Sequence, residues 1–283
     1  YDVLYAASCA VRRGVTVNGL RCAPQEFAAA VDFGLEPSPF CDAAFLLTDP
    51  QLRPGRHAYH HAGVFYDRHV DVQLVDGESL DEQNVSEVLG DASGILVPGG
   101  FGKRALEGKI LAAEFAREHK IPYLGICLGM QVAVCEFARN VVGLAGASSS
   151  EFDPDGPYSV IDLMSSQEDV TEKGGTMRLG AYPCKLAADT LAREAYGEEL
   201  VYERHRHRFE FNNAFRDQLE DAGLVISGLS PDERLVEMVE LPRDVHPWYV
   251  ATQAHPEFKS RPTNPQPVSY THLRAHETTL HLV

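Results

Sequence analysis

The chain has 283 residues, enough to bury a substantial core in one or two domains. Its 41 acidic and 25 basic residues give a formal net charge of −16, which argues against nucleic acid or an anionic membrane as partner. The six cysteines form no CxxC pair, so neither a zinc site nor a disulfide framework is indicated, and a reducing cytoplasm fits best. No run of about 18 apolar residues and no leader is seen, so nothing signals membrane insertion or export. The absence of a starting methionine suggests a fragment.

The first 57 residues show the least regular pattern of the chain. Prolines interrupt the apolar residues, and only a short helix over residues 25–33 and a strand over 43–47 are expected. No GxxxxGK[ST] segment occurs anywhere, so the chain has no visible P-loop for phosphate binding.

From residue 60 the pattern changes to strands that alternate with helices. Expected strands cover residues 70–75, 94–97 and 121–126, and expected helices cover residues 79–89, 106–119 and 130–139. This alternation predicts a parallel sheet with helices on both faces. Reactive groups gather beyond the carboxyl ends of the strands in such sheets.

The segment Gly125-Ile-Cys-Leu-Gly129 stands between an expected buried strand and an expected helix. Glycines on both sides let the central residue take a strained conformation and stand clear of the sheet. Cys127 is therefore a candidate nucleophile, and the first turn of a helix favours its thiolate form. The pentapeptide alone fits a buried cysteine in a glycine-containing turn equally well.

A second glycine-rich loop, Pro98-Gly-Gly-Phe-Gly102, follows the strand before Cys127. Acyl chemistry at a thiol creates an oxyanion that needs preorganised donors, and glycine can present its N–H at close range. The N–H groups of Gly100 and Leu128 are the candidate pair. Taken alone, the loop fits an ordinary turn between a strand and a helix.

Residues 145–176 form a polar excursion of loops around a short apolar stretch at 160–164. Long loops of this kind often cover sites, so Glu151 is a candidate partner for a substrate amine, although a solvated carboxylate is the default.

The segment Glu203-Arg-His-Arg-His-Arg208 is expected to be extended. That backbone places Arg204, Arg206 and Arg208 on one face, where they suit a carboxylate, and His205 and His207 on the other. No third ligand stands at a recognisable spacing, so we do not expect a metal site.

Residues 223–229, 235–241 and 247–254 alternate as antiparallel strands, and the last of them ends at His255-Pro-Glu257. In extended backbone His255 and Glu257 project to the same side, so the carboxylate can orient the imidazole. This supplies nucleophile, base and orienting acid in the chain order Cys, His, Glu, unlike the order of α/β-hydrolases. Taken alone, the tripeptide fits an ordinary turn at a strand end.

The three segments GGFG, GICLGMQ and HPEF together resemble a class I glutamine amidotransferase. Longer strings resemble the glutaminase domain of CTP synthase, in the order of that family: Ile95-Leu-Val-Pro-Gly-Gly-Phe-Gly102, Ile121-Pro-Tyr-Leu-Gly-Ile-Cys-Leu-Gly-Met-Gln131, Gly174-Gly-Thr-Met-Arg-Leu-Gly180, Glu203-Arg-His-Arg-His-Arg208 and His255-Pro-Glu-Phe258. The likeness covers about residues 60–267.

The resemblance implies a flavodoxin-like α/β fold with a mostly parallel sheet, flanking helices and an antiparallel extension. It implies that Cys127 attacks the side-chain amide of L-glutamine and forms a thioester, while His255, oriented by Glu257, moves the protons. Arg208 would hold the α-carboxylate of glutamine and Glu151 its ammonium. The residues implied to bind glutamine are Gly100, Leu128, Gly129, Met130, Gln131, Glu151 and Arg208.

The resemblance also implies that ammonia passes to a synthetase domain that aminates ATP-activated UTP to CTP. The ATP, UTP and Mg²⁺ sites belong to that domain, which the chain does not show, so no cofactor is expected here. Assembly into a homo-oligomer is expected only of the full-length family. Without the signal from the synthetase domain, we expect low activity.

Two segments depart from the family pattern. Residues 1–57 lack the strand and helix expected before His60-His-Ala-Gly63, and residues 268–283 are unlike the closing helix that should follow Pro267. We interpret both segments as foreign or mis-framed, with a glutamine amidotransferase domain at 58–267 and a sheet that lacks its first strand. Two alternatives stay open: an inactive remnant or binding module of the same fold, and another Cys-His-Glu hydrolase of γ-glutamyl substrates.

Overall fold

The computed structural model describes residues 3–8, 14–17, 23–31, 34–37, 44–48, 65–68, 72–163, 177–261 and 265–279. The chain divides into a larger unit, Tyr1–Ala6 with Leu74–Val283, and a smaller unit, Ala7–Gln73. The boundary at residue 58 that the sequence predicts for the glutamine amidotransferase domain stays a prediction. The motif at residues 60–63 and the first half of the motif at 174–180 lie outside the described residues.

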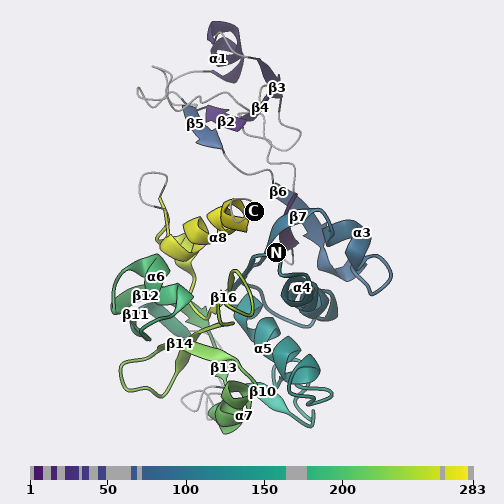
Figure 1. The fold of residues 1–283 in the computed structure, drawn as a ribbon, viewed down its shortest axis with the longest axis vertical. Helices are drawn as coiled ribbons and strands as arrows, with labels where there is room; N and C mark the ends of the chain where they lie inside the picture. Colours follow the sequence, from purple (N-terminus) through teal and green to yellow (C-terminus); the bar gives the residue numbers. More distant parts are fainter. Residues whose placement is uncertain are drawn as a thin grey trace. The chain divides into compact units, whose positions relative to one another are not determined.

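The larger unit is built on a nine-stranded sheet with the order β12-β11-β14-β15-β16-β8-β7-β1-β6 (Figure 1). The strands are β1 (Val3–Ser8), β6 (Val72–Asp76), β7 (Ala92–Val97), β8 (Tyr123–Ile126), β11 (Arg178–Leu186), β12 (Leu200–His207), β14 (Val225–Leu229), β15 (Val236–Glu240) and β16 (Tyr249–Thr252).

Parallel pairing in the middle of the sheet aligns the ends of three strands. β7 pairs in parallel with β8, Val97 opposite Gly125, and β8 pairs in parallel with β16, Ile126 opposite Thr252. On the other side of β16, strands β15, β14, β11 and β12 follow in antiparallel pairs. This arrangement confirms the α/β fold with an antiparallel extension. The chain segments that leave β7, β8 and β16 therefore meet at one edge.

Both faces of the sheet are covered, because successive side chains of a strand point to opposite faces. Tyr123 and Tyr249 belong to one core cluster, which includes residues of α4 (Leu106–His119) and α5 (Leu128–Asn140). Leu124 and Val250, their neighbours in sequence, belong to a second cluster with residues of α6 (Leu191–Tyr196) and α8 (Pro267–Thr279). Buried apolar side chains on both faces explain why β8 and β16 are continuously apolar.

The helix predicted at 106–119 is found with the same bounds, and the one predicted at 130–139 is found as part of α5. The helix predicted at 79–89 is instead a 3-10 turn at Gly77–Ser79 followed by the short α3 (Val85–Leu89). Asp81 N–H donates to Asn84 Oδ1 at 3.0 Å, and Asn84 N–H donates to Asp81 Oδ1 at 2.9 Å. These side chains compete with helical hydrogen bonds and delay the start of the helix.

A small second sheet includes two strands of the polar region that was expected to form loops. β10 (Ser159–Leu163) pairs antiparallel with β13 (Phe209–Phe211) and parallel with β9 (Ser148–Ser149). Two short helical segments follow β13, the 3-10 turn Asn213–Phe215 and α7 (Arg216–Asp221).

Tyr1–Ala6 and residues 268–283, parts of the two segments that we interpreted as foreign, belong to the larger unit. β1 lies between β7 and β6, so the expectation that the sheet lacks its first strand is wrong. α8 buries Val268 completely and His272 almost completely, and it contacts β7, β8 and α6. Among the helices that the structure describes, none combines the length and hydropathy needed to cross a bilayer.

The smaller unit contains a four-stranded antiparallel sheet with the order β3-β4-β2-β5. Its elements are β2 (Gly14–Val17), α1 (Pro24–Ala30), β3 (Leu35–Pro37), β4 (Ala44–Leu47) and β5 (Phe65–Arg68). Phe27 of α1 packs on Phe45 of β4, with ring centroids 6.1 Å apart. The helix predicted at 25–33 is present as α1, which begins one residue earlier and ends three residues earlier, and the strand predicted at 43–47 is present as β4.

Candidate active site

Cys127 occupies a sharp turn between β8 and α5. Its φ of 51° and ψ of −102° lie in a region that side chains with a Cβ rarely adopt. The residue caps α5, since the N–H groups of Met130 and Gln131 donate to its carbonyl oxygen at 3.0 and 3.2 Å. The predicted strand-turn-helix elbow is therefore present, with Cys127 as its strained central residue.

The two glycines of the elbow are required by close backbone contacts. A Cβ at Gly129 would lie 2.1 Å from the carbonyl oxygen of Val97, and a Cβ at Gly125 would lie 2.6 Å from that of Gly129. Tyr123 Oη also donates to the Gly129 carbonyl at 2.8 Å. Glycine at these positions lets α5 begin directly against β7 and β8.

The thiol and the imidazole come from neighbouring parallel strands. The backbone N–H of Cys127 donates to the carbonyl of Thr252, the last residue of β16, at 2.7 Å. His255 follows three residues later, and its own N–H donates to the carbonyl of Arg204 at 2.7 Å. Gly99, after β7, lies against both side chains: a Cβ there would be 2.7 Å from His255 Cε1 and 3.5 Å from Cys127 Cβ.

His255 and Glu257 interact as predicted, but through a different backbone. His255 Nδ1 and Glu257 Oε1 are 2.7 Å apart, so the carboxylate accepts from Nδ1–H. The segment Pro256–Phe258 is a 3-10 turn, so the expectation of extended backbone is wrong. The turn also stacks Phe258 on the imidazole, with centroids 4.9 Å apart and planes 9° from parallel. Two contacts therefore fix the orientation of the ring.

The environment of His255 favours its protonated form. Burial lowers the pKa of His255, but interactions with Cys127 and Glu257 outweigh that effect and raise the pKa to about 9. Its Nε2 is buried and makes no hydrogen bond of normal geometry within the described part of the chain. Contacts between catalytic groups commonly tighten only when substrate is bound.

A cavity of about 220 Å³ opens beside Cys127. The residues that line it come from the two glycine-rich turns, α5, the polar excursion, the residue that precedes β11 and the stretch where β12 gives way to β13: Gly100, Phe101, Cys127, Gln131, Glu151, Met177, His207, Arg208 and Phe209. Its volume is below the range of roughly 300–1,000 Å³ that suits drug-sized ligands, which indicates a smaller molecule such as an amino acid.

Glu151 and Arg208 bring opposite charges to this cavity. Glu151 Oε1 accepts from the N–H of Gly102 at 3.3 Å. Burial raises the pKa of Glu151, while the Gly102 hydrogen bond and the nearby Arg208 lower it in part. The structure does not gather the three predicted arginines, because Arg204 and Arg206 are exposed on β12 and only Arg208 lines the cavity.

Three residues implied to bind glutamine do not line the cavity. The side chains of Leu128 and Met130 are buried in the core, and Gly129 packs against Val97. Any role in binding is thus limited to their backbone groups at the start of α5. The N–H of Leu128 stays a candidate donor together with that of Gly100.

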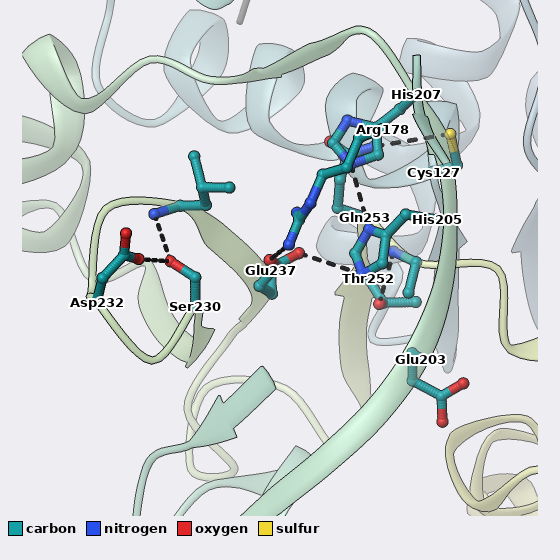
Figure 2. Close-up of polar contacts among 12 residues, drawn as sticks. Cys127, Arg178, Glu203, His205, His207, Ser230, Asp232, Glu237, Thr252 and Gln253 are labelled. Carbon is teal, nitrogen blue, oxygen red and sulfur yellow. Dashed lines mark hydrogen bonds and ion pairs between the residues drawn. The ribbon is translucent and has the colours of Figure 1, made fainter. Parts of the chain in front are cut away.

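Behind the cavity lies a buried polar network, drawn in Figure 2. His207 Nδ1–H donates to the Phe209 carbonyl at 3.1 Å, and His207 Nε2 is 3.2 Å from His205 Nδ1. His205 Nε2 lies 3.6 Å from Glu237, which forms a 2.6 Å ion pair with Arg178. Within the described residues, no three His, Cys, Asp or Glu side chains are grouped to hold a metal ion.

Burial keeps both imidazoles of the network neutral. It lowers the pKa of His205 to about 2 and that of His207 to about 3, and the positive charge of Arg178 adds to the effect. The two histidines therefore act as a hydrogen-bonded support for the cavity wall.

Sequence reasoning gave no site role to Phe209 or Gln253, and it weighed His207 only as a metal ligand. Gln253 is fully buried and its Nε2 lies 3.6 Å from Cys127 Sγ. The distance in sequence between these two residues hides the contact, and only the parallel pairing of β8 with β16 could have indicated it.

Comparisons with known proteins agree with this geometry. The family model of class-I glutamine amidotransferases matches residues 57–274. The CTP synthase of Caldanaerobacter subterraneus subsp. tengcongensis is 62% identical over 218 residues, 77% of this chain and 40% of that protein. The CTP synthase of Carboxydothermus hydrogenoformans is 61% identical over 211 residues, 75% of this chain and 39% of that protein.

Among solved structures, the glutaminase domain of Trypanosoma brucei CTPS with bound acivicin superposes with a TM-score of 0.67 at 39% identity. The match covers 72% of this chain and 79% of that one. The chain belongs to the class I glutamine amidotransferase family. Within the family, the similarity falls on the glutaminase part of CTP synthases, and the chain spans about 40% of the length of the curated relatives it matches.

Proposed function

We propose that the chain hydrolyses L-glutamine at Cys127 and releases ammonia. The observation that carries the proposal is the cavity itself, which places a buried thiol together with a carboxylate and a guanidinium in a volume of about 220 Å³. The position of Cys127 in a strained elbow next to the His255–Glu257 pair supports a nucleophilic role.

The two charged side chains suit the two charges of a free amino acid. Arg208 can hold the α-carboxylate of glutamine bidentately, and Glu151 can accept from its ammonium group. The side chain of glutamine then extends toward Cys127. A peptide-bound glutamine lacks both charges, so we expect the free amino acid to be the substrate.

In the first step, the thiol proton already lies on His255, whose protonated form the site favours, and the sulfur of Cys127 attacks the amide carbon of the glutamine side chain. The N–H groups of Gly100 and Leu128 stabilise the oxyanion that forms. The imidazolium then gives its proton to the leaving nitrogen, the C–N bond breaks, and ammonia departs from a γ-glutamyl thioester. In the second step, His255 activates a water molecule that cleaves the thioester, which yields glutamate and regenerates the thiol.

The fate of the ammonia follows from the relatives. Because the match covers only about 40% of the CTP synthases compared, we infer that a synthetase domain uses the ammonia to aminate UTP to CTP with ATP. Cys127, Cys135 and Cys184 carry free thiols, which supports a reducing compartment such as the cytoplasm.

Ammonia release from glutamine by the purified chain tests the proposal. Activity should be low but measurable, and Cys127→Ala should abolish it. Cys135→Ala is the matched control, since this buried cysteine lies on the same helix and outside the cavity. Equal rates from the unchanged chain and Cys127→Ala would remove the assignment, and release from γ-glutamyl peptides alone would redirect it to another hydrolase.

A further inference from the structure

Gln253 is the polar side chain that reaches the sulfur from beneath the cavity. It directly follows β16, it is fully buried, and its backbone N–H donates to the carbonyl of Glu237 at 2.8 Å. Its Nε2 lies 3.6 Å from Cys127 Sγ, and Figure 2 draws both residues. The backbone hydrogen bond fixes the residue at this place in the sheet.

The orientation of the Gln253 amide follows from a neighbouring amide. Gln131 Nε2 donates to the carbonyl oxygen of Phe209 at 3.0 Å and to Gln253 Oε1 at 3.3 Å. A peptide carbonyl can only accept, so the nitrogen of Gln131 must face Phe209. Gln253 consequently turns its oxygen to Gln131, and its N–H groups are left to face the sulfur.

The carbonyl of Phe209 is itself held in place. It accepts a second hydrogen bond, from His207 Nδ1 at 3.1 Å, and His207 is supported in turn by His205. A carbonyl oxygen has two lone pairs, so both donors can be satisfied at once. The Phe209 carbonyl therefore determines the orientation of the Gln131 amide and, through it, the orientation of the Gln253 amide.

An N–H donor that points at a buried sulfur favours the thiolate over the thiol, because hydrogen bonds to an ionised acceptor are stronger than those to a neutral one. We propose that Gln253 stabilises the thiolate of Cys127 and that Gln131 serves this role by orienting the Gln253 amide. This inference deepens the proposed function and rests on it. The inference also changes the role expected of Gln131. Both N–H groups of its amide donate to acceptors inside the protein, so only its Oε1 is left to contact substrate.

The pH dependence of Cys127 alkylation by iodoacetamide, followed by peptide mass mapping, tests the proposal without glutamine. Burial raises the pKa of Cys135 to about 12 and the pKa of Cys184 further, so neither competes near neutral pH. Gln253→Met keeps an unbranched side chain without the donor, and Gln253→Glu replaces the N–H groups with an acceptor. Gln266→Met is the matched control, since Gln266 is also buried but donates to Glu203 and Tyr196.

We expect Gln253→Met to move the midpoint of the alkylation profile upward by about one pH unit, and Gln253→Glu to move it further. Gln266→Met should leave the midpoint in place. An unchanged midpoint in Gln253→Met, or a rate that falls equally at every pH, would show a structural role only and overturn the proposal. If Gln253→Met does not fold, Gln253→Glu tests the proposal in the same way, by whether the midpoint of its alkylation profile moves upward. Alkylation of Cys127 does not require glutamine turnover, so it tests the role of Gln253 alone. If the glutaminase assignment is wrong, the separate assay will show no ammonia release from glutamine.

Discussion

Arg178 and Glu237 form an ion pair inside the larger unit, with Nη2 and Oε1 2.6 Å apart and the two side chains 8% and 1% exposed. Burial raises the pKa of Glu237, and Arg178 opposes this effect through its charge and hydrogen bond. Glu237 also lies 3.6 Å from His205, which burial keeps neutral. A buried pair of this kind is sensitive to the loss of one partner, because the other charge stays in the interior.

Glu237→Gln should therefore lower the free energy of unfolding by about 3 kcal/mol, as measured by urea denaturation at pH 7.5. The double variant Arg178→Met with Glu237→Met should lose less, because it leaves no uncompensated charge. A double variant less stable than Glu237→Gln would contradict this account of the pair.

Glu210 should make stability depend on pH. Burial raises the pKa of Glu210 to about 7, with Arg178 lowering and Glu237 raising it. Since the folded value exceeds the unfolded one of 4.5, the stability that the neutral carboxyl contributes is full below pH 4.5 and is lost as pH rises through 7. Glu210→Gln should raise the urea midpoint relative to the unchanged chain at pH 8 but not at pH 4.5.

The control for that measurement is Glu87→Gln, because Glu87 is an exposed glutamate on α3. It should change the midpoint equally at the two pH values. If Glu210→Gln behaves like Glu87→Gln, then Glu210 does not titrate in the interior as described.

The strained conformation of Cys127 should be visible in stability. At its φ of 51° a Cβ is unfavourable, so Cys127→Gly should be more stable than Cys127→Ala by about 1 kcal/mol. Both variants lack the thiol, so activity does not confuse the comparison. Within α5 the order should reverse, with Cys135→Gly less stable than Cys135→Ala by about 1 kcal/mol. Equal stability of the two Cys127 variants in thermal melts would show that the elbow stores no strain.

Arg208 should contribute to glutamine binding more than its neighbours in sequence do. Arg208→Gln should raise KM for glutamine roughly tenfold to a hundredfold, since a charge-assisted bidentate contact is lost. Arg204→Gln removes the same charge from the exposed face of β12 and should leave KM within about twofold. Steady-state ammonia release over a range of glutamine concentrations measures both. Similar KM values for the two variants would place the α-carboxylate elsewhere.

The local sequence pattern was sufficient to predict the elbow at Cys127, because an apolar strand, a turn with two glycines and a helix follow one another directly in the chain. The contact between His255 and Glu257 was also predicted, although the reason was wrong, since Pro256 begins a 3-10 turn. The strands and helices on either side of Cys127 were predicted well for the same reason: their burial is continuous along the chain.

The other features of the fold and of the site depend on contacts between segments that are distant in sequence, and the sequence pattern does not predict such contacts. The separation of Arg208 from Arg204 and Arg206 depends on where β12 ends, which is fixed by its pairing with β11. The place of β1 between β7 and β6 was invisible in a segment with little periodicity. Gln253 reaches Cys127 only because β16 and β8 lie in register.

Acid-quenched mass mapping during turnover addresses the central claim most directly. The purified chain is mixed with glutamine, stopped with acid within the first turnovers, and digested for peptide analysis. We predict a γ-glutamyl thioester on the peptide that contains Cys127, and none on the peptides with Cys135 or Cys184. Ammonia release with no adduct on Cys127, or with an adduct on another residue, would contradict a thioester mechanism at this site.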